Sequence, residues 1–491
     1  SDVGTANRAL IEAQRSRDED ATREARETIR RIVRQEGAAT LRARVTSETP
    51  FAERLVAFWS NHLCIAVPAK PPLAALAGLY ERQAIRPHLF GRYEDMVLAS
   101  ARHPAMLIYL DNAMSIGPNS EAARNLARRG RERGLNENYA RELLELHTLG
   151  VDGGYTQEDV EALARILTGW TATGFGFADR LARGRGRGDA GSNDGAVAFA
   201  YMDILHEPGD KTLLGVKYRE AGEEEGRRAI ADLCAHPSTA RFLATKLARH
   251  FVADEPPPEA IDRLAHRWIE TDGDLSEVSR ELVDLDEAWD PALRKFRTPQ
   301  DWMTAMLRAV GAREVPEPVG RLLQQLRQPL WAPSSPKGYG DTKGEWADPD
   351  SLLNRAELAR STADRLLAAR PSKPPRSSTK TSRPRPGTRA KLTRGAENVA
   401  SPPAHIPRTK SRLRMLTSTG TPGRQRPAPC ARQRKWRRRS AALPEDPRPR
   451  CPLRPGAWRD RPRRRLARRP LPDPASLPPA FPPCFGPAPP G

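Results

Sequence analysis

The feature that most constrains the fold is a series of segments whose apolar residues recur at three- and four-residue spacing. That spacing places the apolar side chains on one face of an α-helix, where they can be buried together. Proline stands at or just before several segment starts, where its missing N–H costs least (Pro50, Pro71, Pro87 and Pro104). The segments cover residues 51–65, 72–84, 92–101, 104–110, 136–149, 156–170, 222–235, 238–252, 257–270, 275–285, 299–311 and 317–327. The pattern predicts a mainly α chain.

One stretch departs from the helical pattern. Residues 196–218 contain two short apolar runs on either side of "HEPGDK", which favours a β-hairpin with His206, Glu207 and Asp210 in a solvated turn. The expected architecture is a multi-helix domain over residues 1–369 with this small β-hairpin insertion.

The composition changes sharply near residue 370. Residues 370–491 hold 31 Lys and Arg against 5 Asp and Glu, and 27 of the 47 prolines, whereas residues 1–369 carry a net charge of −6. Such a segment buries too little apolar surface to offset its chain entropy, so we expect a disordered basic low-complexity tail. It is either an arginine-rich arm that contacts nucleic-acid phosphates or an out-of-frame translation of a GC-rich gene. Its 26 Arg against 5 Lys, without tyrosine, favours the frameshift, so nucleic-acid binding is not favoured.

Other compositional signals are negative. Only Cys64 and Cys234 fall within the first 369 residues, which does not indicate a disulfide framework. No run of 18 apolar residues predicts a transmembrane segment. The chain starts at Ser1 and contains no signal peptide, so we expect any original N-terminal signal to be missing, and the localisation is left open.

Three histidines fall on predicted apolar helix faces. His147 follows Ala140, Leu143 and Leu144 at the i+7, i+4 and i+3 positions, and His62 and His250 are placed in the same way in their own segments. The adjacent carboxylates of "ELLELH", Glu142 and Glu145, point about 140° or more away from His147 on such a helix.

These histidines have two interpretations. Each alone is typical of a core residue satisfied by one hydrogen bond. Together, on facing helices, they are also candidates for a shared acid–base or divalent-metal site, with Asp111 and Asp152 as further candidate ligands at the pocket rim. A metal site requires the ring nitrogens to lie roughly 4–5 Å apart, given Zn–N distances near 2 Å.

The loop "VDGGYTQEDV" (151–160) invites a calcium-site interpretation, but its acidic residues do not fit the ligand positions of an EF-hand. It fits a helix-to-helix turn better, with Gly150 ending one helix and Thr156 capping the next, helped by Asp159. No serine-hydrolase elbow and no nucleotide-binding glycine motif is present.

Several segments together resemble the bacterial domain-of-unknown-function 1800 family (DUF1800), over nearly all of residues 5–369. They are "ERLVAFWSNHL", "HPAMLIYLDN", "LNENYARELLELHTLGVDGGYTQEDVEALARILTGWT", "ARFLATKLARHFVAD" and "SPKGYGDTKGEWADPDSLLNRAEL". The resemblance implies a large, mainly helical bacterial protein, often exported to the periplasm or envelope, with no established activity. Family members usually have a further N-terminal segment, which is missing here. They also usually continue with a closing helical segment, and the basic tail stands in its place in this chain.

Two classes of function follow from these patterns. The first is a non-catalytic envelope or assembly protein whose polar motifs cap helices and fix turns. The alternative is a metal-dependent enzyme that uses the inward-facing His62, His147 and His250 as catalytic or metal-binding residues.

Overall fold

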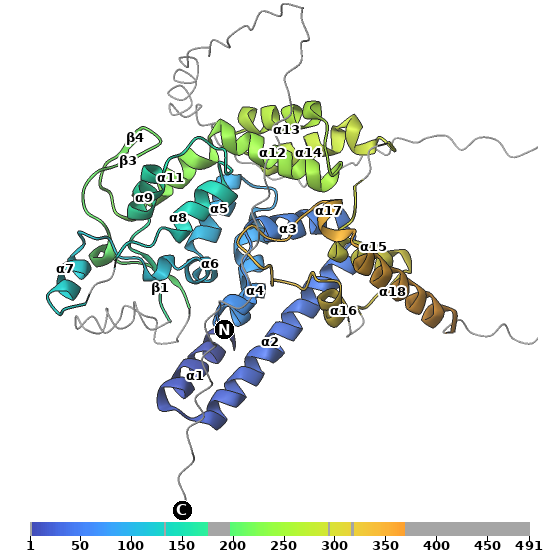
Figure 1. Cartoon of the computed structure of the whole chain (residues 1–491), viewed down its shortest axis with the longest axis horizontal. Coiled ribbons are helices and arrows are strands. Elements are labelled where there is room, and N and C mark those ends of the chain that lie inside the picture. Colours follow the sequence, from blue (N-terminus) through green and yellow to red (C-terminus); the bar gives the residue numbers. More distant parts are fainter. Residues whose placement is uncertain (1, 132–133, 175–196, 293–294, 316–318, 369–491) are drawn as a thin grey trace, which may run out of the picture. The chain divides into compact units, whose positions relative to one another are not determined.

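The computed structural model describes residues 2–131, 134–174, 197–292, 295–315 and 319–368 (Figure 1). The chain divides into two compact units, Ser1–Lys380 and Thr381–Gly491. Every described residue belongs to the first unit, and the predicted tail over 370–491 lies outside the described residues.

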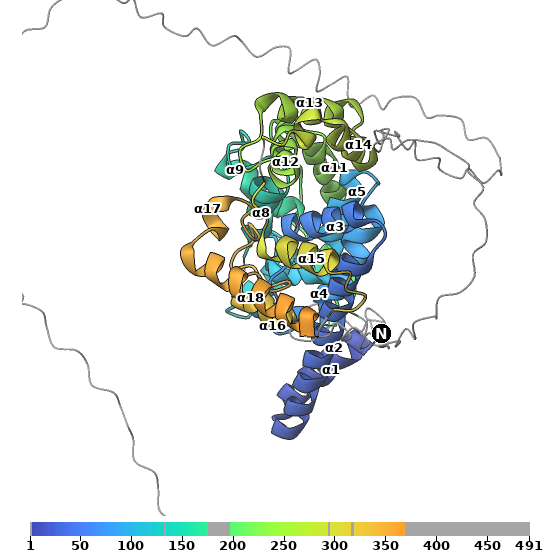
Figure 2. The ribbon, with the colours of Figure 1, turned by 90° about the vertical axis from the view of Figure 1, so that its right-hand side faces the viewer.

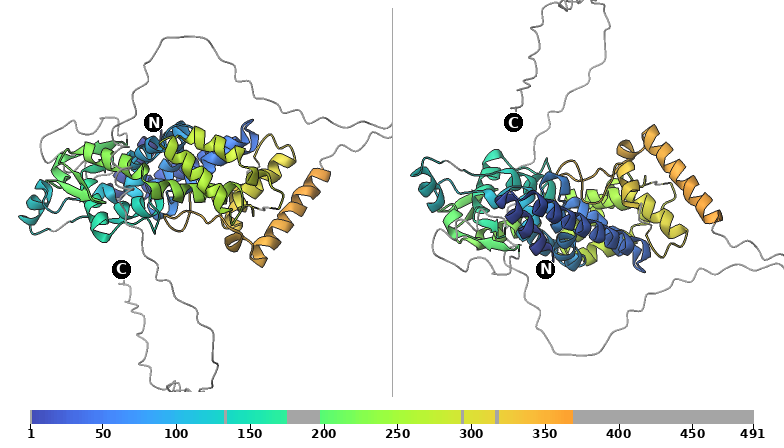
Figure 3. Two further views of the ribbon diagram at one scale, coloured as in Figure 1. Left: turned by 90° about the horizontal axis from the view of Figure 1, so that it is seen from above. Right: turned by 90° about the horizontal axis from the view of Figure 1, so that it is seen from below.

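The first helices confirm the prediction of a mainly α chain. A two-residue link joins α1 (Asp2–Ser16) to α2 (Glu19–Thr46), and the two helices lie side by side (Figure 3). The Asp18 carboxylate caps α2 by accepting from the Ala21 N–H at 2.9 Å. The next elements are α3 (Pro50–His62), η1 (Val67–Ala69), α4 (Leu73–Tyr80), η2 (Glu81–Ile85), η3 (Arg86–His88), α5 (Tyr93–Arg102), α6 (Pro104–Tyr109), η4 (Asn112–Met114) and α7 (Glu121–Ala127).

The second half of the helical unit forms two groups. Helices α12, α13 and α14 pack against one another (Figure 1), while α15 packs against both α2 and α16 (Figure 2). The elements of this half are α11 (Glu223–Cys234), α12 (Pro237–Phe251), α13 (Pro258–Glu270), α14 (Leu275–Asp284), η7 (Asp286–Trp289), α15 (Pro299–Ala309), α16 (Val319–Gln325), α17 (Lys343–Trp346) and α18 (Pro349–Ala368).

The expected small β insertion is confirmed, but the two apolar runs of 196–218 belong to different antiparallel pairs. Strand β1 (Trp170–Ala172) pairs with β2 (Phe199–Tyr201), and β3 (Lys211–Leu213) pairs with β4 (Val216–Tyr218). The second pair turns at Leu214–Gly215, where both residues have positive φ, 49° and 69°. That is the backbone of a tight hairpin turn. The segment "HEPGDK" therefore connects two hairpins, after the short helix η6 (Asp203–Leu205).

The helix around His147 is not a continuous α-helix. After α8 (Asn138–Glu142) the chain widens into a π-helical turn, η5 (Leu143–His147), and η2 is a second π-helical segment. The Thr148 hydroxyl donates to the Leu143 carbonyl at 2.6 Å, and the Gly150 N–H donates to the Leu144 carbonyl at 3.1 Å. Side-chain angles calculated for an α-helix therefore do not hold over this turn, although His147 is still buried.

The turn after η5 matches its prediction. Gly150 has a φ of 85°, and α9 (Gln157–Ile166) begins with a complete capping box between Thr156 and Asp159. A large hydrophobic core extends from α1 to α14, and a smaller one joins α2, α15 and α16 through residues such as Leu41 and Met303. No helix within the described ranges is long and apolar enough to cross a membrane.

Candidate functional site

His62, at the end of α3, is the centre of a buried hydrogen-bonded chain. Its Nε2 lies 2.9 Å from the Tyr93 hydroxyl and 3.3 Å from the His147 carbonyl, and its Nδ1 lies 2.9 Å from Lys246 Nζ. Because a carbonyl can only accept, Nε2 carries the hydrogen and Nδ1 accepts from Lys246. Burial and the nearby Lys246 ammonium hold the pKa of His62 well below its usual value. This imidazole is therefore neutral, with both nitrogens engaged.

The pKa values of His147 and Lys246, which lie beside His62, are also lowered. Burial, with a smaller effect of Lys246, lowers the pKa of His147 to about 3, and burial lowers the pKa of Lys246 to about 8. The His147 carbonyl also accepts from the Tyr93 hydroxyl, while the His147 Nε2 atom has no hydrogen-bond partner. His147 is thus a neutral core histidine, and its backbone carbonyl anchors the side chains of Tyr93 and His62.

The third histidine does not join this chain. His62 and His147 have ring centroids 6.2 Å apart, but the Phe58 ring contacts both His62 and His250, at centroid distances of 6.3 Å and 5.3 Å. Among the residues the structure describes, no group of three or more His, Cys, Asp and Glu side chains is arranged to hold a metal ion.

The two candidate acids lie away from the histidines' polar contacts. Asp111 has a left-handed backbone conformation, with a φ of 66°, and forms an ion pair of 2.7 Å with Lys70. Asp152 is exposed in the turn that follows η5. Glu145 pairs with Arg141, at 3.8 Å.

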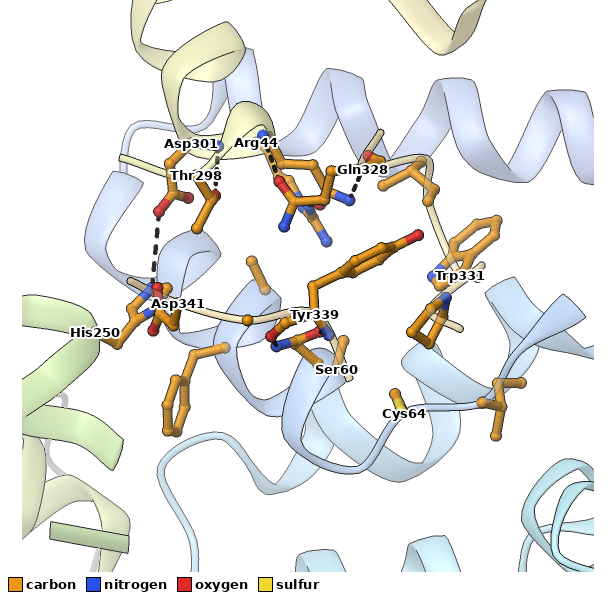
Figure 4. A pocket seen from close by; sticks show the side chains of 18 residues that line it. Arg44, Ser60, Cys64, His250, Thr298, Asp301, Gln328, Trp331, Tyr339 and Asp341 are labelled. Carbon is orange, nitrogen blue, oxygen red and sulfur yellow. Dashed lines mark hydrogen bonds and ion pairs between the residues drawn. The ribbon is translucent and has the colours of Figure 1, made fainter. Parts of the chain in front are cut away.

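His250, in the last turn of α12, forms an acid–imidazole pair with Asp341. Its Nδ1 lies 2.7 Å from the Asp341 carboxylate, so Nδ1 carries the hydrogen that the carboxylate accepts. The remaining nitrogen, Nε2, is buried without a hydrogen-bond partner, and His250 lines a pocket (Figure 4). A carboxylate that fixes the tautomer of a histidine beside a pocket is an arrangement that acid–base catalysts use.

His250 and a buried lysine, Lys295, together keep Asp341 ionised. Lys295 Nζ lies 3.3 Å from the Asp341 carboxylate and 2.7 Å from that of Asp254, and its side chain is 8% exposed. Burial alone raises the pKa of Asp341, but His250 and Lys295 outweigh it and lower that pKa below its usual value. Asp341 is therefore a carboxylate at neutral pH.

A second carboxylate approaches the free side of His250. Asp301, in the first turn of α15, has one oxygen 3.9 Å from His250 Nε2 and 3.8 Å from Arg54 Nε (Figure 4). That oxygen and Arg54 Nε are both buried and without hydrogen-bond partners. The Thr298 hydroxyl caps α15 by accepting from the Asp301 N–H at 3.3 Å, which fixes the start of this helix. Three polar atoms without hydrogen bonds to the described residues thus lie together, with the Asp301 oxygen within ion-pair distance of the other two.

The pocket lies between α2, α3, α12, α15 and the loop 328–341, and Figure 4 shows its side chains. Its volume is about 50 Å³, enough for a few water molecules or a small polar group. Asn61 holds the loop in place, because its amide donates to the Tyr339 carbonyl at 2.9 Å and accepts from the Tyr339 N–H at 2.8 Å. Burial raises the pKa of the Cys64 thiol, which also lines the pocket, to about 12, so it is not a thiolate nucleophile.

A separate polar cluster surrounds the "HEPGDK" segment, where we expected a solvated turn. His206 and Glu207 are buried instead. Lys211 Nζ lies 3.0 Å from the Glu225 carboxylate and 3.2 Å from His206 Nε2, and the Glu207 carboxylate accepts from the Asn119 backbone and side chain. These groups tie β3 to α11 and stabilise the fold.

Sequence reasoning found His250 but missed Asp301 and Asp341. Asp341 lies 91 residues after His250 in a polar loop without regular structure, and Asp301 occupies an ordinary helix-capping position. The only sequence signal for Asp341 was its place in the segment "SPKGYGDTKGEW", which contributed to the family resemblance.

A family model described as "Protein of unknown function (DUF1800)" matches residues 2–440. No curated protein and no solved structure matches the chain. The family match extends past residue 370, and the domain boundary and the frameshift origin of the tail both stay predictions.

Proposed function

This chain belongs to the DUF1800 family, and from that premise we propose that its pocket is an acid–base catalytic site in which His250 transfers the proton. The observation that carries the proposal is the asymmetry of the pocket-lining His250. Its Nδ1 is hydrogen-bonded to Asp341 at 2.7 Å, while its Nε2 has no hydrogen-bond partner among the described residues. The proposed enzyme acts on a small polar substrate.

In the proposed step, His250 Nε2 accepts a proton from a substrate hydroxyl or a water molecule. The imidazolium that forms is stabilised by Asp341, whose lowered pKa keeps it ionised, and Nε2 then returns the proton to the leaving group. Asp301, 3.9 Å from Nε2, is placed to hold the reacting group beside His250. Proton transfer of this kind contributes about 10²–10⁴-fold to a rate.

The proposal narrows the three-histidine hypothesis to one residue. His62 has both ring nitrogens in hydrogen bonds, and the pKa of His147 is lowered to about 3, so neither is placed to exchange protons with the pocket. A divalent-metal site stays a prediction, as does the non-catalytic envelope or assembly role. A turnover screen distinguishes the non-catalytic role from catalysis.

The test is a turnover screen with chromogenic esters, amides, phosphate esters and glycosides, run on the full chain. We expect His250→Asn to lower turnover at least about 100-fold and Asp341→Asn at least about tenfold. His266→Asn is the matched control, because that histidine is 74% exposed on α13. Turnover by His250→Asn equal to the native rate refutes the catalytic role, and absence of turnover by the native chain favours the non-catalytic alternative.

A further inference from the structure

A second pocket adjoins the one at His250 and is rich in arginine. Its volume is about 240 Å³, and the two pockets share Arg44, Ala57 and Asp301. The residues that line it are Arg44, Pro50, Glu53, Arg54, Ala57, Arg297, Asp301, Thr304, Ala305 and Arg308. Four guanidinium groups thus meet two carboxylates around one space.

One of the two carboxylates is already neutralised from outside this pocket. Both oxygens of Glu53 accept from Arg86, at 2.8 Å and 3.0 Å, and Arg86 is not among the lining residues. Arg44 is likewise paired outside the pocket, with the Glu81 carboxylate at 3.8 Å. Asp301 is then the lining carboxylate that faces Arg54, Arg297 and Arg308, so the pocket carries an excess of positive charge. Within a pocket, such charge attracts an anion more strongly than on an open surface.

Two of the arginines have an Nε–H group that donates no hydrogen bond to any residue the structure describes. Arg44 is 6% exposed, and its Nε is buried without a hydrogen-bond partner. Arg54 donates from Nη2 to the His250 carbonyl at 2.6 Å, but its Nε is also buried and unpartnered. A buried donor without a partner costs about 1–3 kcal/mol, which an accepting ligand recovers.

The other two arginines complete the pocket. Arg308 donates from Nη1 to the carbonyls of Val45 and Ser47, at 2.8 Å and 2.9 Å, and so is fixed in place at the end of α2. Arg297 is exposed and lines the same pocket. The planar guanidinium fork matches the oxygen pairs of carboxylate and phosphate groups.

We propose that this pocket is an oxyanion subsite that binds a carboxylate or phosphate group of the substrate. The assignment of that anion to a substrate rests on the proposed function, whereas anion binding itself does not require His250 to react. Because Asp301 and Arg44 line both pockets, an anion held here places the adjoining part of the same molecule beside His250 Nε2. The substrate class is then a small anionic compound.

The test is calorimetric titration of the full chain, at low ionic strength, with inorganic phosphate in one arm and succinate in the other. We expect saturable binding of at least one probe, and the arm that binds identifies the group. Arg297→Gln and Arg54→Gln should each weaken binding about tenfold, since each removes a charge-assisted contact. Arg31→Gln, an exposed arginine of α2, removes the same charge outside the pocket and should leave binding unchanged.

Arg297→Gln keeps the test decisive if Arg54→Gln fails to fold, because Arg297 is exposed. Binding of neither probe overturns the subsite, and so does binding that both arginine variants retain at full strength. His250→Asn should still bind the anion. If it binds while the native chain turns over no substrate, the subsite stands and the catalytic proposal fails.

Discussion

Replacing Asp341 by Asn removes one negative charge from the centre of the proposed site while keeping the shape of the side chain. Asp341 accepts from His250 Nδ1 at 2.7 Å and lies 3.3 Å from Lys295 Nζ, and Lys295 keeps Asp254 as a second partner. A hydrogen bond to a charged group is worth about 1.5–3 kcal/mol, against about 1 kcal/mol for a neutral one. Two contacts, each weakened by about 0.5–2 kcal/mol, therefore predict a loss of about 1–4 kcal/mol in the free energy of unfolding at pH 7.

The lowered pKa of Asp341 determines how the stability lost in Asp341→Asn changes with pH. The pKa of Asp341 is lower in the folded chain than the unfolded value of about 3.9. Its contribution to stability is therefore fully present above the unfolded pKa and is lost as the pH falls through the folded pKa. The difference between native chain and Asp341→Asn should therefore shrink as the pH falls below about 4.

The assay is urea unfolding, followed by circular dichroism, at a series of pH values between 8 and 3.5. Glu270→Gln serves as the control, since Glu270 pairs only at the surface of α13, with His266 and Arg267. Exposed pairs of this kind contribute about 0–1 kcal/mol. Equal stability of native chain and Asp341→Asn at pH 7 would refute the ionised buried pair, as would a difference that does not change at low pH.

Two further predictions concern packing and a buried lysine. Gly226→Ala should destabilise the chain by about 1–3 kcal/mol, because the new Cβ would lie 2.5 Å from the Trp170 ring. Gly320→Ala places its Cβ where nothing lies within 4 Å and should stabilise its helix by up to about 1 kcal/mol. Urea unfolding measures the free energy of unfolding of both variants. Lys246, with a folded pKa of about 8 against about 10.4 unfolded, should make native stability rise between pH 8 and 10 relative to Lys246→Met. A difference between those two proteins that does not change with pH would contradict the lowered pKa.

The helical spacing of apolar residues was enough to predict the class of fold and the burial of the three histidines. It worked because helix periodicity is local: Leu55, Phe58 and His62 share a face whatever the rest of the chain does. The same logic failed where the backbone departed from 3.6 residues per turn. The π-helical turn that ends at His147 depends on the contacts of its carbonyl with Tyr93 and His62, and these partners come from α5 and α3.

The site itself is a product of tertiary structure, so sequence spacing could not assemble it. His250 ends α12, Asp301 begins α15 and Asp341 lies in the loop before α17, and only packing brings the three together. The spacing that marked His62, His147 and His250 as equivalent could not show that Phe58 lies between His62 and His250. A shared metal site stays a prediction from equal helix positions, whereas side-chain partners decide what each histidine can do.

The contrast between the two polar clusters supports placing function at His250 rather than at His206. At His206, Nδ1 lies 2.8 Å from the Thr168 carbonyl and Nε2 lies 3.1 Å from the Glu225 carboxylate, so both ring nitrogens are satisfied by the protein. Around His250, by contrast, buried unpartnered atoms gather beside two adjoining pockets: His250 Nε2, Asp301 Oδ2, Arg54 Nε and Arg44 Nε.

Each such atom costs about 1–3 kcal/mol, and a folded domain is stable by only about 5–15 kcal/mol in total. Four of them in one region are a large fraction of that stability. Their convergence on two pockets is what a binding site for a polar, anionic molecule requires, because the ligand completes the hydrogen bonds that the protein leaves open. On this reasoning, bound phosphate or succinate should raise the unfolding temperature of the native chain more than that of Arg297→Gln.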